Sequence, residues 1–263
     1  MQRELYAVDR STLVADADGE PGRELERARR LVDHRVDGLV VLPIGPSSGE
    51  WASIAEQIPT VTIGDALPGV TAAGEVVFDN ERGVDETLRH LGKIGHTRIV
   101  VLSWAVDSSP DRRAERAVAA SARSLGLDCD VVACAYSLNG SRPLALELLR
   151  ADQRPTAVFC LSDSIAYGVY VACAELGLRI PDDVAVAGFG DHPISRLLAP
   201  PLTSTFWDLD HAAMLATSFL LEAIAADAPP ATLREVIAPE LVRRASTEGT
   251  GRRADRGLPR RAR

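Results

Sequence analysis

One run of the chain, residues 157–204, constrains the fold more than any other segment. It begins with a short apolar stretch, residues 157–161, which predicts a strand buried on both faces, as in a parallel sheet. Helix-capping side chains follow at residues 162–164, and the next helix is expected to end at Gly177 in a left-handed conformation. Residues 184–189 predict a second buried strand. A strand, a helix and a strand in succession form a βαβ unit, whose crossover is expected to be right-handed.

This unit also indicates where a ligand binds. In open α/β sheets, ligands lie beyond the carboxyl ends of the strands. In this chain those ends are residues 161–163 and residues 188–191. We therefore expect the binding residues in these two short stretches.

Strand and helix signals alternate along the rest of the chain. Repeated βα units predict an α/β fold with parallel sheets covered by helices. The expected strands are residues 12–15, 38–42, 60–63, 76–78, 98–103 and 131–135, and the expected helices include residues 23–34, 112–125 and 143–150.

Many ordered motifs make the chain resemble the effector-binding domain of the LacI/GalR repressor family, which has the periplasmic-binding-protein type I fold. The resemblance covers roughly residues 13 to 247. So many matches in order are specific, unlike any one short motif. The residues that carry it are Arg35-Val36-Asp37-Gly38-Leu39-Val40, Phe78-Asp79-Asn80-Glu81-Arg82-Gly83, His90-Leu91-Gly92-Lys93-Ile94-Gly95-His96, Pro155-Thr156-Ala157, Ser162-Asp163, Ile180-Pro181-Asp182-Asp183-Val184, Gly188-Phe189, Pro201-Leu202-Thr203 and Pro239-Glu240-Leu241.

The resemblance implies two Rossmann-like lobes with the ligand in the cleft between them. It assigns residues 1–103 and 208–238 to the N-terminal lobe, and residues 104–207 and 239–248 to the C-terminal lobe. Residues 249–263 are expected to be a disordered basic tail. Closure of the lobes around the ligand is the expected conformational response.

The beginning of the chain departs from the family pattern. Family members start with a helix-turn-helix DNA-binding domain and a hinge helix, followed by the first strand of the N-terminal lobe. This sequence opens on what resembles the end of the first lobe helix, so we expect that first strand to be missing and its neighbours to lack a partner. Met1 is interpreted as a misassigned internal start, with a degenerate remnant as the alternative. DNA binding would then depend on a helix-turn-helix absent from this chain.

Three candidate ligand contacts lie at the carboxyl ends of the strands. Phe159 falls where the family often places an aromatic against the ligand, although a phenylalanine in a strand is more often a core residue. Ser162 matches a position that touches ligand hydroxyls, and its alternative role is helix capping. Asp191 follows Gly190, which stands where the family has a ligand-binding carboxylate. Asp191 is a substitute only if its side chain turns towards the ligand, because successive residues of a strand point in opposite directions.

Three further candidates are less certain in role. Arg113 is the nearest match to an effector-binding arginine, and its alternative is an ordinary solvated side chain. Trp207 stands at the second crossover, where an indole either stacks on a planar ligand or packs the hinge. Asp79 either contacts ligand or caps the following helix.

Composition bounds the function. The four cysteines form no CxxC pair and the five histidines show no metal-binding spacing, so we expect reduced structural thiols, no metal and no cofactor. No nucleophile or phosphate-binding motif is present, and an enzyme is not expected. The segment 243–263 holds eight Arg and two acidic residues, a net charge of +6. Since the whole chain has a net charge of −8, residues 1–242 have a net charge of −14. Such an acidic body is a poor surface for DNA.

The leading hypothesis is the ligand-sensing domain of a LacI-family transcriptional regulator that binds a small polar effector, a sugar or a nucleoside. The sequence has no apolar run of membrane-spanning length and no signal peptide, so we expect a cytoplasmic protein without membrane contact, assembled as a homodimer. One alternative is a solute-binding protein of a transport system. Another is a truncated remnant without ligand function.

Overall fold

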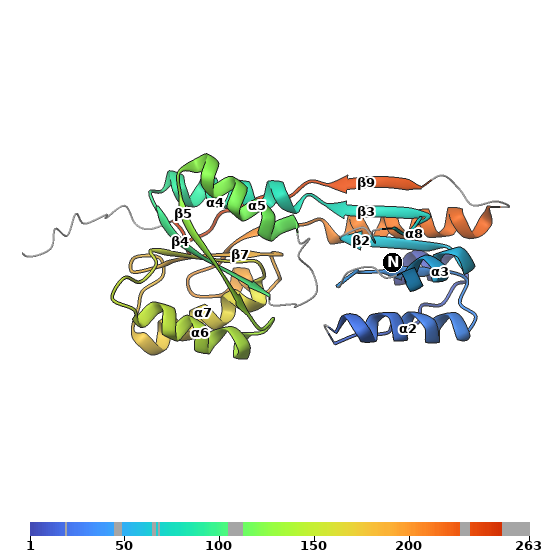
Figure 1. The fold of residues 1–263 in the computed structure, drawn as a ribbon, viewed down its shortest axis with the longest axis horizontal. Helices are drawn as coiled ribbons and strands as arrows, with labels where there is room; N and C mark the ends of the chain where they lie inside the picture. Colours follow the sequence, from blue (N-terminus) through green and yellow to red (C-terminus); the bar gives the residue numbers. More distant parts are fainter. Residues whose placement is uncertain are drawn as a thin grey trace, which may run out of the picture. The chain divides into compact units, whose positions relative to one another are not determined.

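The computed structural model describes residues 1–18, 20–44, 49–64, 67, 69–104, 113–226 and 232–248. The chain forms two compact units (Figure 1). Unit 1 comprises Met1–Arg89, Ala105–Ser124 and Thr205–Leu241, and unit 2 comprises His90–Trp104, Leu125–Ser204 and Val242–Arg263. The expected basic tail, residues 249–263, lies outside the described residues. The lobe boundaries given above remain a proposal.

Helices and strands alternate along most of the described chain, as the sequence predicts. The helices are α1 (Gln2–Ala7), α2 (Pro21–Asp33), α3 (Gly49–Gln57), α4 (Asn80–Lys93), α5 (Arg113–Leu125), α6 (Leu138–Arg150), α7 (Asp163–Leu176) and α8 (Leu209–Ala225), with a short 3-10 turn at Ser195–Leu197. The strands are β1 (Leu39–Val41), β2 (Thr60–Gly64), β3 (Gly74–Phe78), β4 (Arg98–Trp104), β5 (Asp128–Cys134), β6 (Ala157–Cys160), β7 (Ala185–Phe189), β8 (Thr203–Phe206), β9 (Leu233–Ile237) and β10 (Glu240–Val242).

Unit 1 is built on a parallel sheet with the strand order β1-β2-β3-β9. Helix α8 runs beside the sheet (Figure 1) and packs so closely that a Cβ atom at Gly74 would lie 2.7 Å from the ring of Phe219. The other face of β1 joins a core with α2 and α3, to which Leu39, Trp51 and Ile54 contribute buried side chains. Both faces of the sheet are therefore covered by helices, as a parallel sheet requires.

The predicted strand at residues 12–15 is wrong. These residues form no regular element, and their backbone makes no hydrogen bond to the described residues. The sequence is rich enough in apolar and β-branched residues for a strand, but a strand exists only when a neighbour supplies the opposing hydrogen bonds. No described strand lies beside this segment.

Unit 2 contains a sheet with the order β10-β8-β7-β6-β4-β5, in which the pairs among β5, β4, β6 and β7 are parallel. The four residues of β6 are all buried, as the apolar run predicts. Helices α6 and α7 lie side by side against the sheet (Figure 1). Ile165 and Val169 of α7 are fully buried among residues such as Val158 and Leu102, so the βαβ unit carries the main core of unit 2.

The ends of α7 agree with the sequence analysis. The hydroxyl of Ser162 accepts a hydrogen bond from the Ser164 amide at 3.2 Å, which satisfies one of the free N–H groups of the first turn. Gly177 ends the helix with φ 64°, the left-handed conformation that glycine adopts at low cost. Ser162 therefore determines where α7 begins after the carboxyl end of β6, and Gly177 determines where the helix ends.

Candidate functional site

The carboxyl ends of four strands meet at one edge of the unit 2 sheet. Leu102 of β4 pairs with Cys160 of β6, and Phe159 of β6 pairs with Ala187 of β7. The amide of Leu161 still donates to the Leu102 carbonyl at 2.9 Å, so the register continues past the end of β6. If the same pairing register is extended by two residues, Trp104, Ser162 and Gly190 lie in one row across β4, β6 and β7. Ligands bind at this end of the strands in open α/β sheets.

Aromatic rings stand at this edge. Trp104 ends β4, and its ring lies 5.2 Å from that of Tyr136, which follows β5, at an angle of 50°. Trp104 is half-buried and Tyr136 is 49% exposed, so this pair presents ring surface to the outside of the unit. Phe189 at the end of β7 is also partly exposed and packs against Phe159, with ring centroids 6.2 Å apart. Flat apolar faces beside polar groups are typical of pockets for small polar ligands.

Asp163 holds the loop after β7 in place. Its side chain is completely buried, and one carboxylate oxygen accepts hydrogen bonds from the His192 amide at 2.8 Å and the Ser195 hydroxyl at 2.5 Å. The other oxygen accepts one from the Ser204 hydroxyl at 2.6 Å. These bonds compensate for the desolvation of a buried carboxylate. The residue is structural, as expected, but it binds the loop and β8 rather than capping α7.

Asp191 is committed to an ion pair. Its carboxylate faces the guanidinium of Arg244 in a two-pronged contact, with nitrogen–oxygen distances of 2.5 and 2.9 Å. This contact raises the pKa of Arg244, and the same guanidinium also donates to the carbonyl of Leu202 at 2.7 Å. The φ of 44° at Asp191 is left-handed, so the chain turns sharply after Gly190. The carboxylate that follows Gly190 therefore stabilises the loop, and any ligand contact must share it with Arg244.

The structure places the other predicted contacts of unit 2 in or near the core. Phe159 has no exposed surface, which favours its core role over direct contact with ligand. Ser162 is 3% exposed and caps α7, the role that the sequence analysis gave as the alternative.

The predicted contacts of unit 1 also have structural partners. The carboxylate of Asp79 accepts a hydrogen bond from the Arg82 amide at 3.1 Å, so it caps α4. Trp207 is 5% exposed, and its ring lies 5.0 Å from that of Phe78 at the end of β3. Arg113 is the first residue of α5, but its side chain lies outside the described residues.

The described part of the chain holds no group of three or more His, Cys, Asp or Glu side chains arranged to bind a metal. Burial raises the pKa of the Cys134 thiol to about 11 and that of Cys173 to about 12. These thiols are protonated near neutral pH and therefore weakly nucleophilic. The cysteines thus pack as small apolar side chains.

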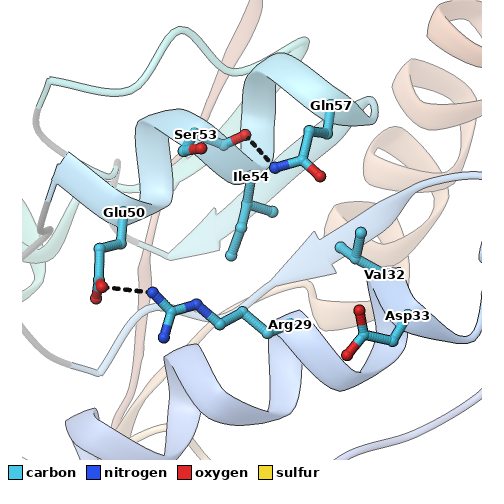
Figure 2. A pocket seen from close by; sticks show the side chains of 7 residues that line it. All are labelled: Arg29, Val32, Asp33, Glu50, Ser53, Ile54 and Gln57. Carbon is cyan, nitrogen blue, oxygen red and sulfur yellow. Dashed lines mark hydrogen bonds and ion pairs between the residues drawn. The ribbon is translucent and has the colours of Figure 1, made fainter.

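A shallow pocket of about 280 Å³ lies in unit 1 between α2 and α3 (Figure 2). Arg29 extends across it to form an ion pair with Glu50, and the Gln57 side chain donates to the Ser53 carbonyl at 2.9 Å. Arg29, Glu50 and Gln57 are thus already paired within the pocket, and we do not assign it a ligand.

Three residues at this edge, Trp104, Tyr136 and Arg244, were not among those predicted from the sequence. Trp104 directly follows the predicted strand 98–103, so the rule that ligands bind beyond the carboxyl ends of strands was sufficient to find it. Tyr136 follows β5 in the same way. No local signal points to Arg244, because its partner is 53 residues away in the chain.

Comparison with known proteins agrees with this fold. Residues 88–247 match the model of the periplasmic binding protein-like domain family. The chain is 31% identical over 250 residues to the HTH-type transcriptional regulator MalR of Streptomyces coelicolor, covering 90% of this chain and 71% of that protein. The chain belongs to the LacI family of transcriptional regulators. This confirms the resemblance stated from the sequence, and the chain is the ligand-sensing domain of such a regulator.

Two further LacI-family comparisons bear on the fold and the ligand. The ribose operon repressor of Escherichia coli (strain K12) is 29% identical over 230 residues, 85% of this chain and 69% of that protein. A LacI-family regulator from Enterococcus faecium, solved with bound ribose, has a TM-score of 0.82 at 19% identity and covers 93% of this chain and 90% of its own. These relatives are transcriptional regulators. None of the helices in the described residues has the length and apolar character needed to span a membrane.

Proposed function

We propose that this chain senses a small, neutral, polyhydroxylated metabolite, a sugar in the first instance, and that the carboxyl edge of the unit 2 sheet binds it. The observation that carries the proposal is the aromatic pair Trp104–Tyr136 at this edge, in the same row as the Ser162 hydroxyl. Aromatic faces pack against the C–H faces of sugar rings, while nearby polar groups bind the hydroxyls. Gly190 in this row supplies backbone groups but no charge.

The choice of a neutral sugar is supported by the charges at this edge. The carboxylate of Asp191 is neutralised by Arg244, and that of Asp163 is buried under three hydrogen bonds. Neither group is therefore available as an unpaired charge to attract an ionic ligand. Ribose is the natural first test compound because one related repressor is named for the ribose operon and one similar structure holds ribose.

We further propose that, of the residues predicted from the sequence, Ser162 and Asp191 contact the ligand at this edge, while Phe159 supports the site from the core through Phe189. The chain acts by binding and not by catalysis, and it assembles as a homodimer in the cytoplasm. Ligand acts by favouring one conformation over another, which requires different affinities for the two conformations.

The test is a binding screen on the purified chain. Ribose, other pentoses, hexoses and nucleosides are added separately, and the melting temperature is measured, because a ligand that binds only the folded state raises it. Any compound that raises it is then titrated by calorimetry. We expect at least one sugar to bind, and a folded chain that responds to none of them refutes the proposal.

A pair of variants tests the location of the site. Trp104→Ala is expected to weaken binding by at least about tenfold, since a ring stacked on a ligand contributes on the order of 1 kcal/mol or more. Tyr6→Ala is the matched control, because Tyr6 is 84% exposed on α1 and outside the proposed site. Unchanged affinity in Trp104→Ala would move the site away from this edge.

A further inference from the structure

The loop after β7 contains one polar side chain that the proposed function leaves unassigned. The loop begins at Gly190, which has no side chain and whose φ of 120° is rarely adopted by residues that have one. The end of β7 therefore offers a ligand only backbone groups at this position. Apart from the neighbours of Gly190 in the chain, the nearest side chain is the imidazole of His192.

The imidazole of His192 lies beside the place that a side chain at Gly190 would occupy. A Cβ atom on Gly190 would lie 3.4 Å from Cδ2 of the ring and 3.5 Å from Nε2. Gly190 itself continues the row of Trp104 and Ser162 across the carboxyl ends of the strands. The ring edge that carries Nε2 therefore lies where ligands bind in open α/β sheets.

The backbone of His192 is fixed, whereas its ring is free. The amide donates to the buried carboxylate of Asp163 at 2.8 Å, and the carbonyl accepts a hydrogen bond from the Ser195 amide at 2.8 Å. The ring makes no hydrogen bond or ion pair with any residue that the structure describes. A polar group on a fixed backbone suits binding, because less conformational freedom is lost when the ligand arrives.

The other polar side chains around this loop are already occupied. The carboxylate of Asp191 pairs with Arg244, and that of Asp163 is buried under three hydrogen bonds. Pro193 and Ile194, which follow in the loop, have no polar side-chain atoms. Within residues 190–194, the imidazole of His192 is therefore the polar side chain that is free to meet a ligand.

We propose that His192 determines the specificity of the site, because its imidazole binds ligand hydroxyls in place of a side chain at residue 190. This inference rests on the proposed function, the binding of a sugar at the carboxyl edge of unit 2. A neutral imidazole donates from one ring nitrogen and accepts at the other, as a sugar hydroxyl also does both, whereas a carboxylate only accepts. An ammonium group only donates, so it suits a carboxylate better than an imidazole. The site therefore selects a neutral sugar over the corresponding amino sugar.

The experiment compares two variants of the complete chain. Ribose, xylose, glucose and galactose are titrated by calorimetry into the parent, His192→Phe and His192→Gln. The sugar that binds the parent most tightly is then tested again as its amino analogue and as its single deoxy analogues. Phenylalanine keeps a ring without nitrogen, and glutamine keeps a donor and an acceptor without the ring. His34→Phe is the matched control, because His34 is an exposed histidine at the end of α2 in unit 1.

The parent is expected to bind at least one neutral sugar, and to bind it more tightly than its amino analogue. Affinity is expected to fall at least about fivefold in His192→Phe, to recover in part in His192→Gln, and to stay unchanged in His34→Phe. One deoxy analogue should bind the parent about fivefold more weakly than the sugar itself, but His192→Phe only about twofold more weakly, because the partner of that hydroxyl is already gone. Without sugar, the melting temperature of His192→Phe should stay within about 2 °C of the parent, since the ring has no partner to lose.

Two results separate this inference from the proposed function. Equal sugar affinity in the parent and in His192→Phe, with weaker binding in Trp104→Ala, overturns the role of His192 and supports the site. A folded parent that binds no sugar refutes the proposed function, and the role of His192 with it. Tighter binding of the amino analogue than of the sugar also contradicts the inference.

A second measurement needs no ligand. Carbethoxylation by diethyl pyrocarbonate, followed by mass spectrometry of the peptides, should modify His192 faster than His90. The ring of His90 is buried, and its Nε2 lies 2.9 Å from the hydroxyl of Thr247. Equal or slower modification of His192 would show that its ring nitrogens are not free and would overturn the proposal.

Discussion

Replacing Asp163 by alanine tests the reasoning about the loop after β7. The variant removes the acceptor of three hydrogen bonds in a fully buried site. The Ser195 hydroxyl is able to turn to Tyr167, whose hydroxyl lies 3.1 Å away. The His192 amide and the Ser204 hydroxyl have no such substitute among the partners described. Two buried donors are therefore left without a hydrogen-bond acceptor.

The size of the effect follows from those two donors. Each unsatisfied buried donor lowers the free energy of unfolding by about 1–3 kcal/mol, so the two together are expected to lower it by about 4 kcal/mol. For a domain of this size, 1 kcal/mol corresponds to roughly 2–4 °C, which gives a decrease in melting temperature of about 8–16 °C. Asp163→Asn keeps the shape and one acceptor oxygen, so its loss is expected to be about 1–2 kcal/mol.

The assay is urea unfolding followed by circular dichroism, with calorimetry for the melting temperature. Asp182→Ala is the matched control, because exposed Asp182 forms its ion pair with exposed Arg179, and its melting temperature should stay within about 2 °C of the parent. Hydrogen exchange in peptides covering residues 188–195 should accelerate in Asp163→Ala and not in the control. An Asp163→Ala protein that unfolds within about 1 kcal/mol of the parent would refute the account.

Three shorter predictions follow from other buried positions. Gly188→Ala should destabilise unit 2 by about 1–3 kcal/mol in urea unfolding, because its Cβ would lie 2.2 Å from a carboxylate oxygen of buried Asp163. Gly22→Ala is the control and should be neutral or slightly stabilising, because there is open space around Gly22. Burial and then Arg243 lower the pKa of His90 below its ordinary value of 6.5, so the unfolded chain binds the proton more readily and stability falls as pH drops from about 6.5. Calorimetry against pH should show a weaker dependence of the melting temperature in His90→Gln, and a dependence equal to that of the parent would contradict this. The four cysteine thiols should react with a disulfide reagent at pH 8 far more slowly in the native protein than in denaturant, because burial raises the pKa of Cys134 to about 11. Fast reaction of all four thiols in the native protein would contradict this prediction.

The sequence was sufficient for the elements whose signals are local. The apolar run before Ser162, the capping hydroxyl and Gly177 each depend on residues close in the chain, and β6 and α7 lie where these signals predict them. The family resemblance rests on similar local motifs and is confirmed by the comparisons. Residues 12–15 show the limit of such signals, because the segment has strand propensity but no strand beside it.

The candidate site depends on contacts that no local pattern reveals. The sequence placed the site at the carboxyl ends of the strands and noted that Gly190 replaces a carboxylate. Only the tertiary structure decided that Asp191 pairs with Arg244, that Asp163 fastens the loop to β8, and that Trp104 stands beside Tyr136. Local propensity acts within a few residues, whereas these partners are brought together by the order and register of the strands. The sequence thus determined the fold and the edge at which to look, and packing between distant segments decided which side chains remain free there to meet a ligand.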